Sequence, residues 1–245
     1  MFWDSSLINK YNMEGLILAA GLGTRLRPLT NDRPKALVEI NGKTLFEITI
    51  QRMVDAGVKR CVVNVHYFGD MLINFIRSRD WPCEVLISDE RQLLLNTGGA
   101  LKHAAHLFSG NEPVLVHNVD ILSDIDFHAL ECHHLGTGNL VTLCTSHRTT
   151  KRMLLFDKTG QLAGRYGEID ATGLTQMAFS GVSMVSPDLF PLLPPDDHQY
   201  PAIDTYIEIA KHHRIGYFMH SPEHWLDVGT PEMVEKAKTL PWLAM

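Results

Sequence analysis

An apolar segment that runs directly into a glycine-rich, basic turn is the feature that most constrains this 245-residue chain. Residues 14–20 are apolar enough to form a buried strand, and Gly21 and Gly23 follow at once. Glycine has no Cβ, so the backbone of such a turn can approach a ligand closely. Backbone N–H groups there, with Arg25 and Lys35 shortly after, are typical of a site that holds a polyphosphate.

Two common phosphate-binding patterns do not match this turn. A P-loop needs G-x-x-x-x-G-K-[ST] and a dinucleotide fingerprint needs G-x-G-x-x-G, and the run from Gly21 to Leu26 provides neither. The remaining alternative is a plain strand-to-helix turn of an α/β fold. Such a turn has no need of Arg25, Arg27 and Lys35 together, so the sequence favours an anion site.

The overall charge makes the basic turn stand out. The chain has 22 Lys and Arg against 28 Asp and Glu, a formal net charge of −6. That balance argues against a general nucleic-acid binder and against a protein of acidic membrane surfaces. Arg25, Arg27, Arg33 and Lys35 therefore form a local basic cluster on an acidic background, as an anion site would.

Cysteine usage and hydropathy bear on the compartment. The 4 cysteines have no C-x-x-C spacing, so we expect neither a zinc site nor a disulfide framework, and a cytoplasmic location fits. No apolar stretch approaches the roughly 20 residues of a membrane span. The first residues also lack the basic region and apolar core of a secretory signal. We therefore expect no membrane partner.

The order of the elements indicates the fold class. In the first half, apolar runs with strand character alternate with segments of helical spacing, which predicts an α/β fold with a mostly parallel sheet flanked by helices. Ligands of such open sheets bind off the carboxyl ends of the strands, so the Gly21 turn and Asp120 should face one cleft. The expected strands cover residues 14–20, 60–65, 84–87 and 113–117, and the expected helices cover 44–56, 70–77 and 97–107.

The second half is less regular and reads as a layer added to the same sheet. It has no repeat, no low-complexity stretch and no linker, which favours a single domain. Residues 157–160 read as a turn and the proline-rich residues 191–195 as a surface loop. The expected strands cover residues 139–145, 152–156 and 176–185, and the expected helices cover 201–213 and 232–240.

Two aspartates from distant segments suggest a metal site. Asp120 and Asp227 each follow a short apolar run, which would project them into the cleft. Mg²⁺ commonly binds through one or two carboxylates together with substrate phosphates. An isolated aspartate after a strand is more often a helix cap or a turn residue. That is the role we expect for Asp124 and Asp126.

The basic turn closely resembles that of the sugar-1-phosphate nucleotidyltransferases. Their motif is G-x-G-[ST]-R-[LM]-x-P-[LM]-T followed by a Pro-Lys pair, and residues 21–30 with Pro34 and Lys35 match it without gaps. The resemblance covers nearly the whole chain after Met13 and implies the nucleotide-diphospho-sugar transferase fold, which is Rossmann-like. We therefore expect residues 1–12 to be an N-terminal extension and residues 13–245 to be one nucleotidyltransferase domain.

The resemblance also implies catalytic roles. Arg25 would hold the departing pyrophosphate, Lys35 the α-phosphate or the sugar phosphate, and Asp120 together with Asp227 a Mg²⁺ ion. The first aspartate motif departs from the family pattern, because Val119 stands where glycine is usual. That departure is expected to narrow the cleft beside the metal without removing the ligand.

Nucleotide and sugar contacts are implied in the same way. Gln92 or Asn96 could read a base edge; a helix N-cap by Asn96 or Thr97 is the alternative. Gly181 and Glu168 are expected on the sugar side. Most of the 13 histidines should be solvated, with His117 the one close to the site. The expected nucleotide-binding residues are Leu18, Ala19, Ala20, Gly21, Gly23, Thr24, Arg25, Asn96, Thr97 and Gly98.

The implied reaction transfers a nucleoside monophosphate from a nucleoside triphosphate to a sugar-1-phosphate. The nearest resemblance is to the N-acetylmuramate-1-phosphate uridylyltransferases of cell-wall sugar recycling, which favours UTP and a hexosamine phosphate. Mannose-1-phosphate guanylyltransferases, phosphocholine cytidylyltransferases and non-catalytic nucleotide-sugar sensors remain alternatives. The partners are thus small substrates rather than nucleic acid or membrane, and the sequence leaves the oligomeric state open.

Overall fold

A computed structural model describes residues 13–243 of the chain. The expected N-terminal extension, residues 1–12, lies outside the described residues, as do residues 244–245. Within the described range, no helix is long and apolar enough to cross a membrane.

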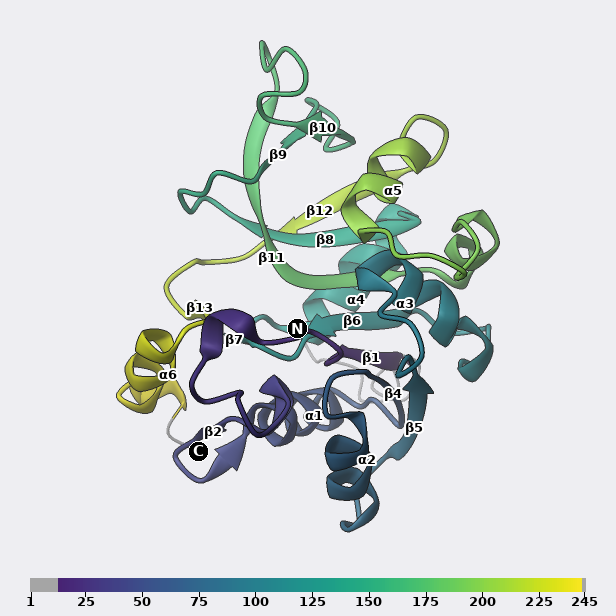
Figure 1. The fold of residues 1–245 in the computed structure, drawn as a ribbon. Coiled ribbons are helices and arrows are strands. Elements are labelled where there is room, and N and C mark those ends of the chain that lie inside the picture. Colours follow the sequence, from purple (N-terminus) through teal and green to yellow (C-terminus); the bar gives the residue numbers. More distant parts are fainter. Residues whose placement is uncertain (1–12, 244–245) are drawn as a thin grey trace, which may run out of the picture.

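One nine-stranded sheet organises the molecule, with helices on both of its faces (Figure 1). Its strands are β1 (Glu14–Leu18), β4 (Arg60–Val65), β5 (Glu84–Asp89), β6 (Val114–Asn118), β8 (Val141–Ser146), β9 (Met153–Phe156), β10 (Leu162–Arg165), β11 (Thr175–Val185) and β12 (Ile215–Met219). Strands β6, β1, β4 and β5 form a parallel core. The long strand β11 runs antiparallel to β6, β8 and β9, and β12 is parallel to β8. The mixed α/β sheet expected from the sequence is confirmed.

Among residues 13–243, six α-helices, one small hairpin and one further pair of short strands complete the fold. The helices are α1 (Leu45–Asp55), α2 (Gly69–Arg77), α3 (Asn96–Ala104), α4 (Phe127–Thr137), α5 (Ala202–Ile209) and α6 (Pro231–Lys238). The hairpin pairs β2 (Glu39–Ile40) with β3 (Lys43–Thr44), and a separate antiparallel pair joins β7 (Ile121–Ser123) to β13 (Trp225–Asp227). The β7–β13 pair and α6 lie on the left in Figure 1, beyond the carboxyl ends of β1 and β6.

Alternating side chains of the central strand build one core on each face of the sheet. Ile17 of β1 packs in a cluster with Phe46 and Met53 of α1, whereas Leu16 packs on the other face with Leu101 of α3 and Tyr206 of α5. All six side chains are buried. Each such burial stabilises the fold by about 1.5–3 kcal/mol before the loss of conformational entropy is counted.

Local sequence signals explain where α1 begins and ends. Thr44 and Glu47 form a reciprocal capping box, in which Thr44 Oγ1 accepts from the Glu47 N–H and the Glu47 carboxylate accepts from the Thr44 N–H. After the last turn, Gly57 adopts a φ of +89°, a conformation that glycine reaches without strain. These signals match the expected helix at residues 44–56 within two residues at either end.

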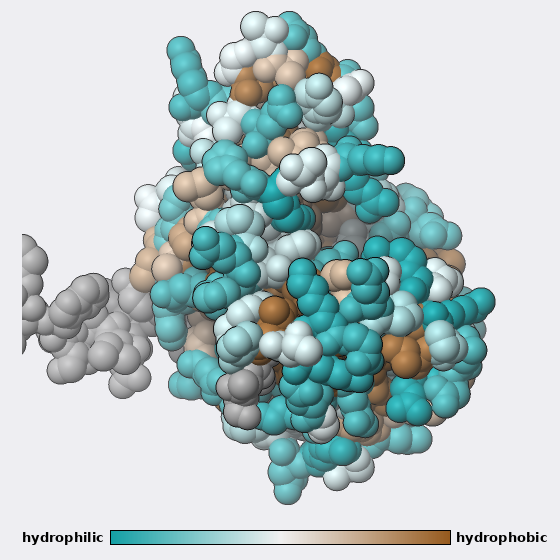
Figure 2. All heavy atoms as spheres, turned by 90° about the vertical axis from the view of Figure 1, so that its left-hand side faces the viewer, coloured by the Kyte–Doolittle hydropathy of each residue, from teal (hydrophilic) through white to brown (hydrophobic). Residues whose placement is uncertain are grey.

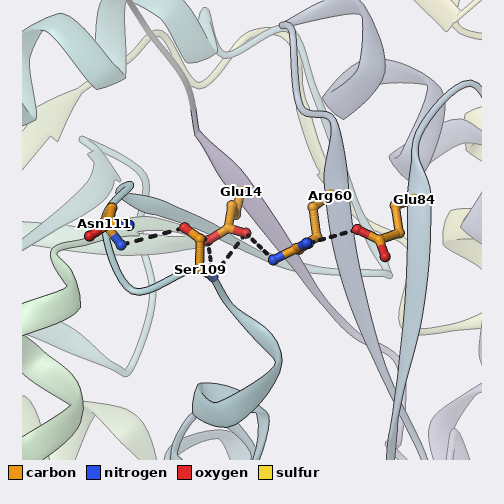
Figure 3. Close-up of polar contacts among 5 residues, drawn as sticks. All are labelled: Glu14, Arg60, Glu84, Ser109 and Asn111. Atoms are coloured by element: carbon orange, nitrogen blue, oxygen red, sulfur yellow. Dashed lines mark hydrogen bonds and ion pairs between the residues drawn. The ribbon is translucent and has the colours of Figure 1, made fainter.

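A polar network ties the amino ends of the parallel strands together (Figure 3). The Glu14 carboxylate of β1 accepts hydrogen bonds from the N–H and Oγ of Ser109, and Arg60 of β4 approaches it at 3.4 Å. Arg60 Nε also donates to Glu84 Oε2 of β5 over 2.8 Å. The network occupies the amino ends of these strands. The carboxyl ends, on the opposite side of the sheet, remain available for a ligand.

Seven elements of the described chain were not predicted from the sequence: α4, β2, β3, β7, β10, β12 and β13. Helix α4 shows no apolar stripe at helical spacing, because Glu131 and His134 are buried in it beside Phe127 and Leu130. In addition, the helix expected at residues 201–213 ends at Ile209. The other expected elements are present, with ends shifted by a few residues.

His134 is buried and is an exception to the expectation that most histidines are solvated. Its side chain is 1% exposed, with Nδ1 2.9 Å from Thr142 Oγ1 and Nε2 3.0 Å from Ser186 Oγ. Burial, reinforced by the neighbouring His133, lowers the pKa of His134 from 6.5 to about 4. The imidazole is therefore neutral at pH 7.

This buried histidine should destabilise the protein in mild acid. As pH falls through 6.5, the unfolded chain binds a proton that the folded chain refuses until pH reaches about 4, so folding stability decreases. Between pH 7 and pH 5 the loss due to His134 should be about 2 kcal/mol. In urea unfolding, His134→Gln should lose that much less stability than the wild type over this interval. The exposed control His212→Gln should lose as much unfolding free energy between pH 7 and pH 5 as the wild type. If His134→Gln also loses as much as the wild type, the lowered pKa of His134 is not the cause.

Candidate active site

The turn after β1 is held in place by hydrogen bonds within the protein. Asn64 Oδ1 of β4 accepts the N–H groups of Ala19 and Ala20 at 2.6 and 3.2 Å. Gly23 adopts a φ of +62°, and its carbonyl accepts from Thr30 Oγ1 at 2.7 Å. The protein's own hydrogen bonds thus fix the turn, and the N–H groups of Ala19 and Ala20 are used inside the protein.

A buried pair, Asn64 and Glu90, links this turn to the segment before α3. Asn64 Nδ2 donates to Glu90 Oε1 at 2.9 Å, and the other Glu90 oxygen accepts from the Leu95 N–H at 3.4 Å. The two side chains are 3% and 2% exposed, and burial raises the pKa of Glu90. Sequence reasoning missed both residues, although an asparagine inside the apolar run of β4 is an unusual choice that signals a buried polar contact.

Removing the Asn64 amide should disturb nucleotide binding as well as stability. Asn64→Ala leaves two backbone donors and the Glu90 carboxylate without this partner, at about 1–3 kcal/mol for each buried group. We expect unfolding stability to fall and KM for the nucleoside triphosphate to rise at least tenfold. Val63→Ala, which shortens the next buried side chain of the same strand, is the control. It should lower stability while leaving KM unchanged; a KM that follows stability in both variants would contradict this role.

Two cation–carboxylate pairs stand at the carboxyl ends of the strands. Lys35 Nζ lies 3.0 Å from Asp120 Oδ2, and these side chains are only 13% and 15% exposed. Arg25 Nη2 lies 3.7 Å from Asp227 Oδ2. A Cβ at Gly229 would stand 2.6 Å from Arg25 Nη2 and 2.7 Å from Asp227 Oδ1, so glycine is required for this approach. The structure thus brings together the catalytic residues expected from the sequence.

The antiparallel pairing of β7 with β13 sets the two aspartates side by side. Asp227 pairs with Ile121, the residue after Asp120, and the Val228 N–H donates to the Asp120 carbonyl at 2.9 Å. Burial, with Asp120 nearby, raises the pKa of Asp227. Burial alone would raise the pKa of Asp120 too, but the charge and hydrogen bond of Lys35 outweigh it and lower that pKa. The two carboxylates thus lie close enough for the Asp120 charge to act on the ionisation of Asp227.

The donor set fits a hard divalent cation. Asp227 Oδ1 is buried and has no hydrogen-bond partner among residues 13–243, as expected of an oxygen that awaits a ligand. In the same range, no group of three or more His, Cys, Asp or Glu side chains could hold a metal. An ion here would therefore need oxygens from a substrate, which is the usual arrangement for Mg²⁺.

Gly181 forms the other wall of the site. It has a φ of +76° and lies where the pairing of β11 with β8 shifts register. A Cβ there would stand 2.7 Å from Ile121 Cγ1 and 2.9 Å from Asn118 Nδ2, so the strand can approach β6 and β7 only with glycine. A small cavity of about 50 Å³ joins the expected nucleotide and sugar sides, and Leu18, Thr97 and Gly181 are among the residues that line it.

The surface around this edge suits a charged substrate. Figure 2 shows the face that lies on the left in Figure 1, and hydrophilic side chains cover most of it. Hydrophobic residues are scattered rather than gathered into a large patch there.

A model of the nucleotidyl transferase family matches residues 14–153, more than half of the chain. The chain belongs to this family. The N-acetylmuramate alpha-1-phosphate uridylyltransferase of Caulobacter vibrioides is 34% identical over 235 residues, covering 89% of this chain and 92% of that protein. Mannose-1-phosphate guanyltransferase beta-A of Xenopus laevis is 28% identical over 90% of this chain, which spans 62% of its length.

Solved structures confirm the fold of this nucleotidyl transferase. HddC from Yersinia pseudotuberculosis, complexed with GMP-PN, superposes with a TM-score of 0.73 at 23% identity, covering 93% of this chain and 98% of that one. At this identity the likeness shows the fold alone, which is the fold that the sequence resemblance implied.

The segment expected to read the base is tied to the loop before α5. Thr97 Oγ1 accepts the Ala202 N–H at 2.9 Å, and the Gly98 N–H donates to the Tyr200 carbonyl at 2.9 Å. A Cβ at Gly98 would stand 2.5 Å from the Tyr200 ring. The N-cap alternative is wrong, because no side chain caps α3 and Asn96 Oδ1 accepts from the adjacent Thr97 N–H. Asn96 and Gln92 are solvent-exposed or nearly so, and their base contacts stay predictions.

Packing corrects the expectation for Val119 and defines the state of His117, which lies near Asp120 as expected. Val119 is fully buried in the core, so it does not narrow the cleft beside the aspartates. His117 is also buried, with Nδ1 donating to the Asn118 carbonyl and its ring edge-on to Phe127. Burial, with the Arg52 charge second, lowers the pKa of His117 to about 3. It is a neutral core residue.

The remaining carboxylates lie apart from the site. Asp126 caps α4 by accepting the Ala129 N–H at 3.0 Å, which confirms its expected role. Asp124 Oδ2 contacts His224 Nδ1 at 2.7 Å across the β7–β13 strand pair. Glu168 is exposed in the loop after β10, where its described ion pair is with Arg165 at 3.6 Å. The structure does not bring Glu168 to the aspartates, and its sugar contact stays a prediction.

Proposed function

We propose that this chain transfers a nucleoside monophosphate from a nucleoside triphosphate to a sugar-1-phosphate and releases pyrophosphate. The observation that carries the proposal is the pairing of Lys35 with Asp120 and of Arg25 with Asp227 around a glycine turn. The relative at 34% identity, an N-acetylmuramate alpha-1-phosphate uridylyltransferase, supports the same reaction class.

The chemistry needs positioned charge rather than an acid–base pair. An oxygen of the sugar phosphate bonds to the α-phosphorus, and the bond between the α-phosphorus and the bridging oxygen breaks, so that pyrophosphate leaves with the electron pair. The nucleophile is already an anion at neutral pH, so no side chain has to remove a proton. Lys35 would stabilise charge on the α-phosphate and Arg25 charge on the departing pyrophosphate.

We assign Asp120 and Asp227 as the ligands of a Mg²⁺ ion. When bound, this ion would neutralise phosphate charge and orient the phosphate oxygens. The unpartnered Asp227 oxygen and the raised pKa of Asp227, caused first by burial and then by Asp120, both favour a cation between the carboxylates.

The remaining residues are assigned by their place around this centre. Residues 13–245 would act as one nucleotidyltransferase domain in the cytoplasm. Gly181 and, at the rim, Glu168 would contact the sugar. The nucleotide would contact Leu18, Ala19, Ala20, Gly21, Gly23, Thr24, Arg25, Asn96, Thr97 and Gly98.

For the substrates, UTP with N-acetylmuramate-1-phosphate or a related hexosamine phosphate is our first choice. It follows the uridylyltransferase of Caulobacter vibrioides, whose length this chain spans almost completely. GTP with mannose-1-phosphate is the second candidate, favoured by the guanyltransferase relative at 28% identity.

A pyrophosphate-release screen tests the proposal. The purified protein with Mg²⁺ is assayed with UTP, GTP, CTP and dTTP against N-acetylmuramate-, N-acetylglucosamine-, mannose- and glucose-1-phosphate and phosphocholine. Release with UTP and an N-acetylhexosamine phosphate is expected, and release with GTP and mannose-1-phosphate would move the protein to the second candidate. Nucleotide binding without turnover in any combination would contradict an enzyme and favour a nucleotide-sugar sensor.

A further inference from the structure

Arg148, just after β8, has no role in the reaction described above, although its guanidinium makes several contacts. Nη1 donates to Ser180 Oγ at 3.0 Å and to Ser146 Oγ and the Ala178 carbonyl at 3.2 Å, and Nη2 donates to the Phe179 carbonyl. Apart from Ser146, these acceptors lie in β11 directly before Gly181. The side chain is half-buried, and burial lowers its pKa. No carboxylate pairs with it among the described residues.

The same guanidinium contacts the strand that carries Asp227. Its central carbon lies 3.9 Å from the centroid of the Trp225 ring, over the face of the indole. Trp225 Nε1 in turn donates to the Ser180 carbonyl at 2.9 Å. Trp225 stands two residues before Asp227 in β13, so Arg148 and Ser180 together fix where this strand lies against β11.

The β11 segment held by Arg148 also contacts the strands around Asp120. Gly181 packs against Ile121 and Asn118, the residues on either side of Asp120 and Val119. The Arg148 guanidinium therefore holds the segment before Gly181 in place. Through this segment it also holds the strands next to Asp120 and Asp227.

His220 fixes the hydrogen-bond direction at the centre of the cluster. Its Nδ1 must donate to the Ser221 carbonyl at 2.7 Å, because a carbonyl only accepts. Its Nε2 is then an acceptor, 2.7 Å from Ser180 Oγ, so Ser180 donates to His220 and accepts from Arg148. Burial, with the Arg148 charge contributing, lowers the pKa of His220 and keeps it in this neutral form.

We infer that Arg148 is a positioning residue, which sets the separation of the two aspartates and the sugar-side turn. The inference rests on the proposed function. The role of Arg148 requires a planar guanidinium that donates to several carbonyl and hydroxyl oxygens while it stacks on an indole ring. The ammonium of lysine is a point charge and cannot reproduce that geometry. Residues that orient metal ligands typically affect metal affinity or activity by about 10–100-fold.

The test compares Arg148→Lys with the exposed Arg152→Lys, a charge-preserving control on the same loop. Binding of Mn²⁺ is measured by electron paramagnetic resonance, and KM is measured separately for nucleotide and sugar phosphate. Arg148→Lys should bind Mn²⁺ about tenfold more weakly or worse. It should also raise KM for the sugar phosphate at least tenfold, and leave KM for the nucleotide within about twofold. Arg152→Lys should match the wild type throughout.

A second variant separates positioning from general damage. Trp225→Phe keeps an aromatic face for Arg148 but removes the hydrogen bond to the Ser180 carbonyl, so it should weaken Mn²⁺ binding severalfold. The double variant should be little worse than Arg148→Lys, because both act through one cluster. Wild-type Mn²⁺ affinity in both single variants, or fully additive losses, would overturn the inference. A wild type that binds Mn²⁺ but transfers no nucleotide would refute the proposed function instead.

Discussion

Asp120→Asn is expected to abolish nucleotidyl transfer, with kcat/KM lower by about a thousandfold or more. Asp120 contacts Lys35 at 3.0 Å and has Asp227 beside it across the β7–β13 strand pair, so its carboxylate belongs to both halves of the charged site. Asparagine keeps the shape and the backbone contacts of Asp120 but cannot supply an anionic oxygen. Steady-state pyrophosphate release measures the loss, and unfolding in urea checks that the variant is folded.

Asp124→Asn is the matched control for that substitution. Asp124 lies in the next turn of the chain and contacts His224 at the surface, away from Lys35 and Asp227. Its loss should leave kcat/KM within about threefold of the wild type, the scale of a remote surface charge. Substantial activity in a folded Asp120→Asn protein would refute the carboxylate's role.

Lys35→Met should reduce kcat by at least about a hundredfold, the scale for losing one preorganised charge in a site sheltered from water. The side chain is 13% exposed, and Gly21 leaves room for it, since a Cβ there would stand 3.1 Å from Lys35 Cε. The exposed Lys43→Met is the control and should retain wild-type kcat.

The same variant should also shift the acid limb of the pH profile. In the wild type, Lys35 outweighs burial and lowers the pKa of Asp120, so the carboxylate stays ionised into mild acid. Without the ammonium, burial dominates and that pKa rises, so the residual activity should disappear at a higher pH than in the wild type. An unchanged acid limb in Lys35→Met would contradict the coupling of these two residues.

The charged half of the site could be read from the sequence because its signals are local. Gly21, Gly23, Arg25 and Lys35 fall within one short run, and the structure groups them at the end of β1. Asp120 could likewise be located, because it follows an apolar strand directly. The sequence pattern could not predict that Lys35 pairs with Asp120, because the two residues are 85 positions apart in the chain.

The supporting residues escaped detection because their signals are not local. Asn64 and Glu90 act through side-chain hydrogen bonds between different strands, and neither stands in a recognisable motif. The antiparallel pair β7–β13 consists of three-residue strands that lie more than 100 residues apart in the sequence. Strands this short show no periodicity that a sequence pattern could reveal. The polar residues Glu131 and His134 interrupt the apolar pattern of α4, although both are buried in the fold. A single sequence does not reveal that these polar side chains face the interior.

The most direct test of the central claim follows the α-phosphorus itself. UTP labelled at the α-phosphate is incubated with the protein, Mg²⁺ and N-acetylmuramate-1-phosphate, and the products are separated. The label should enter a nucleotide-sugar while unlabelled pyrophosphate is released, and both should stop when the metal is chelated or when Asp120→Asn replaces the wild type. Label that stays in UTP with every sugar phosphate tried, or transfer that persists without metal, would contradict the claim that these charged pairs and a bound cation perform nucleotidyl transfer.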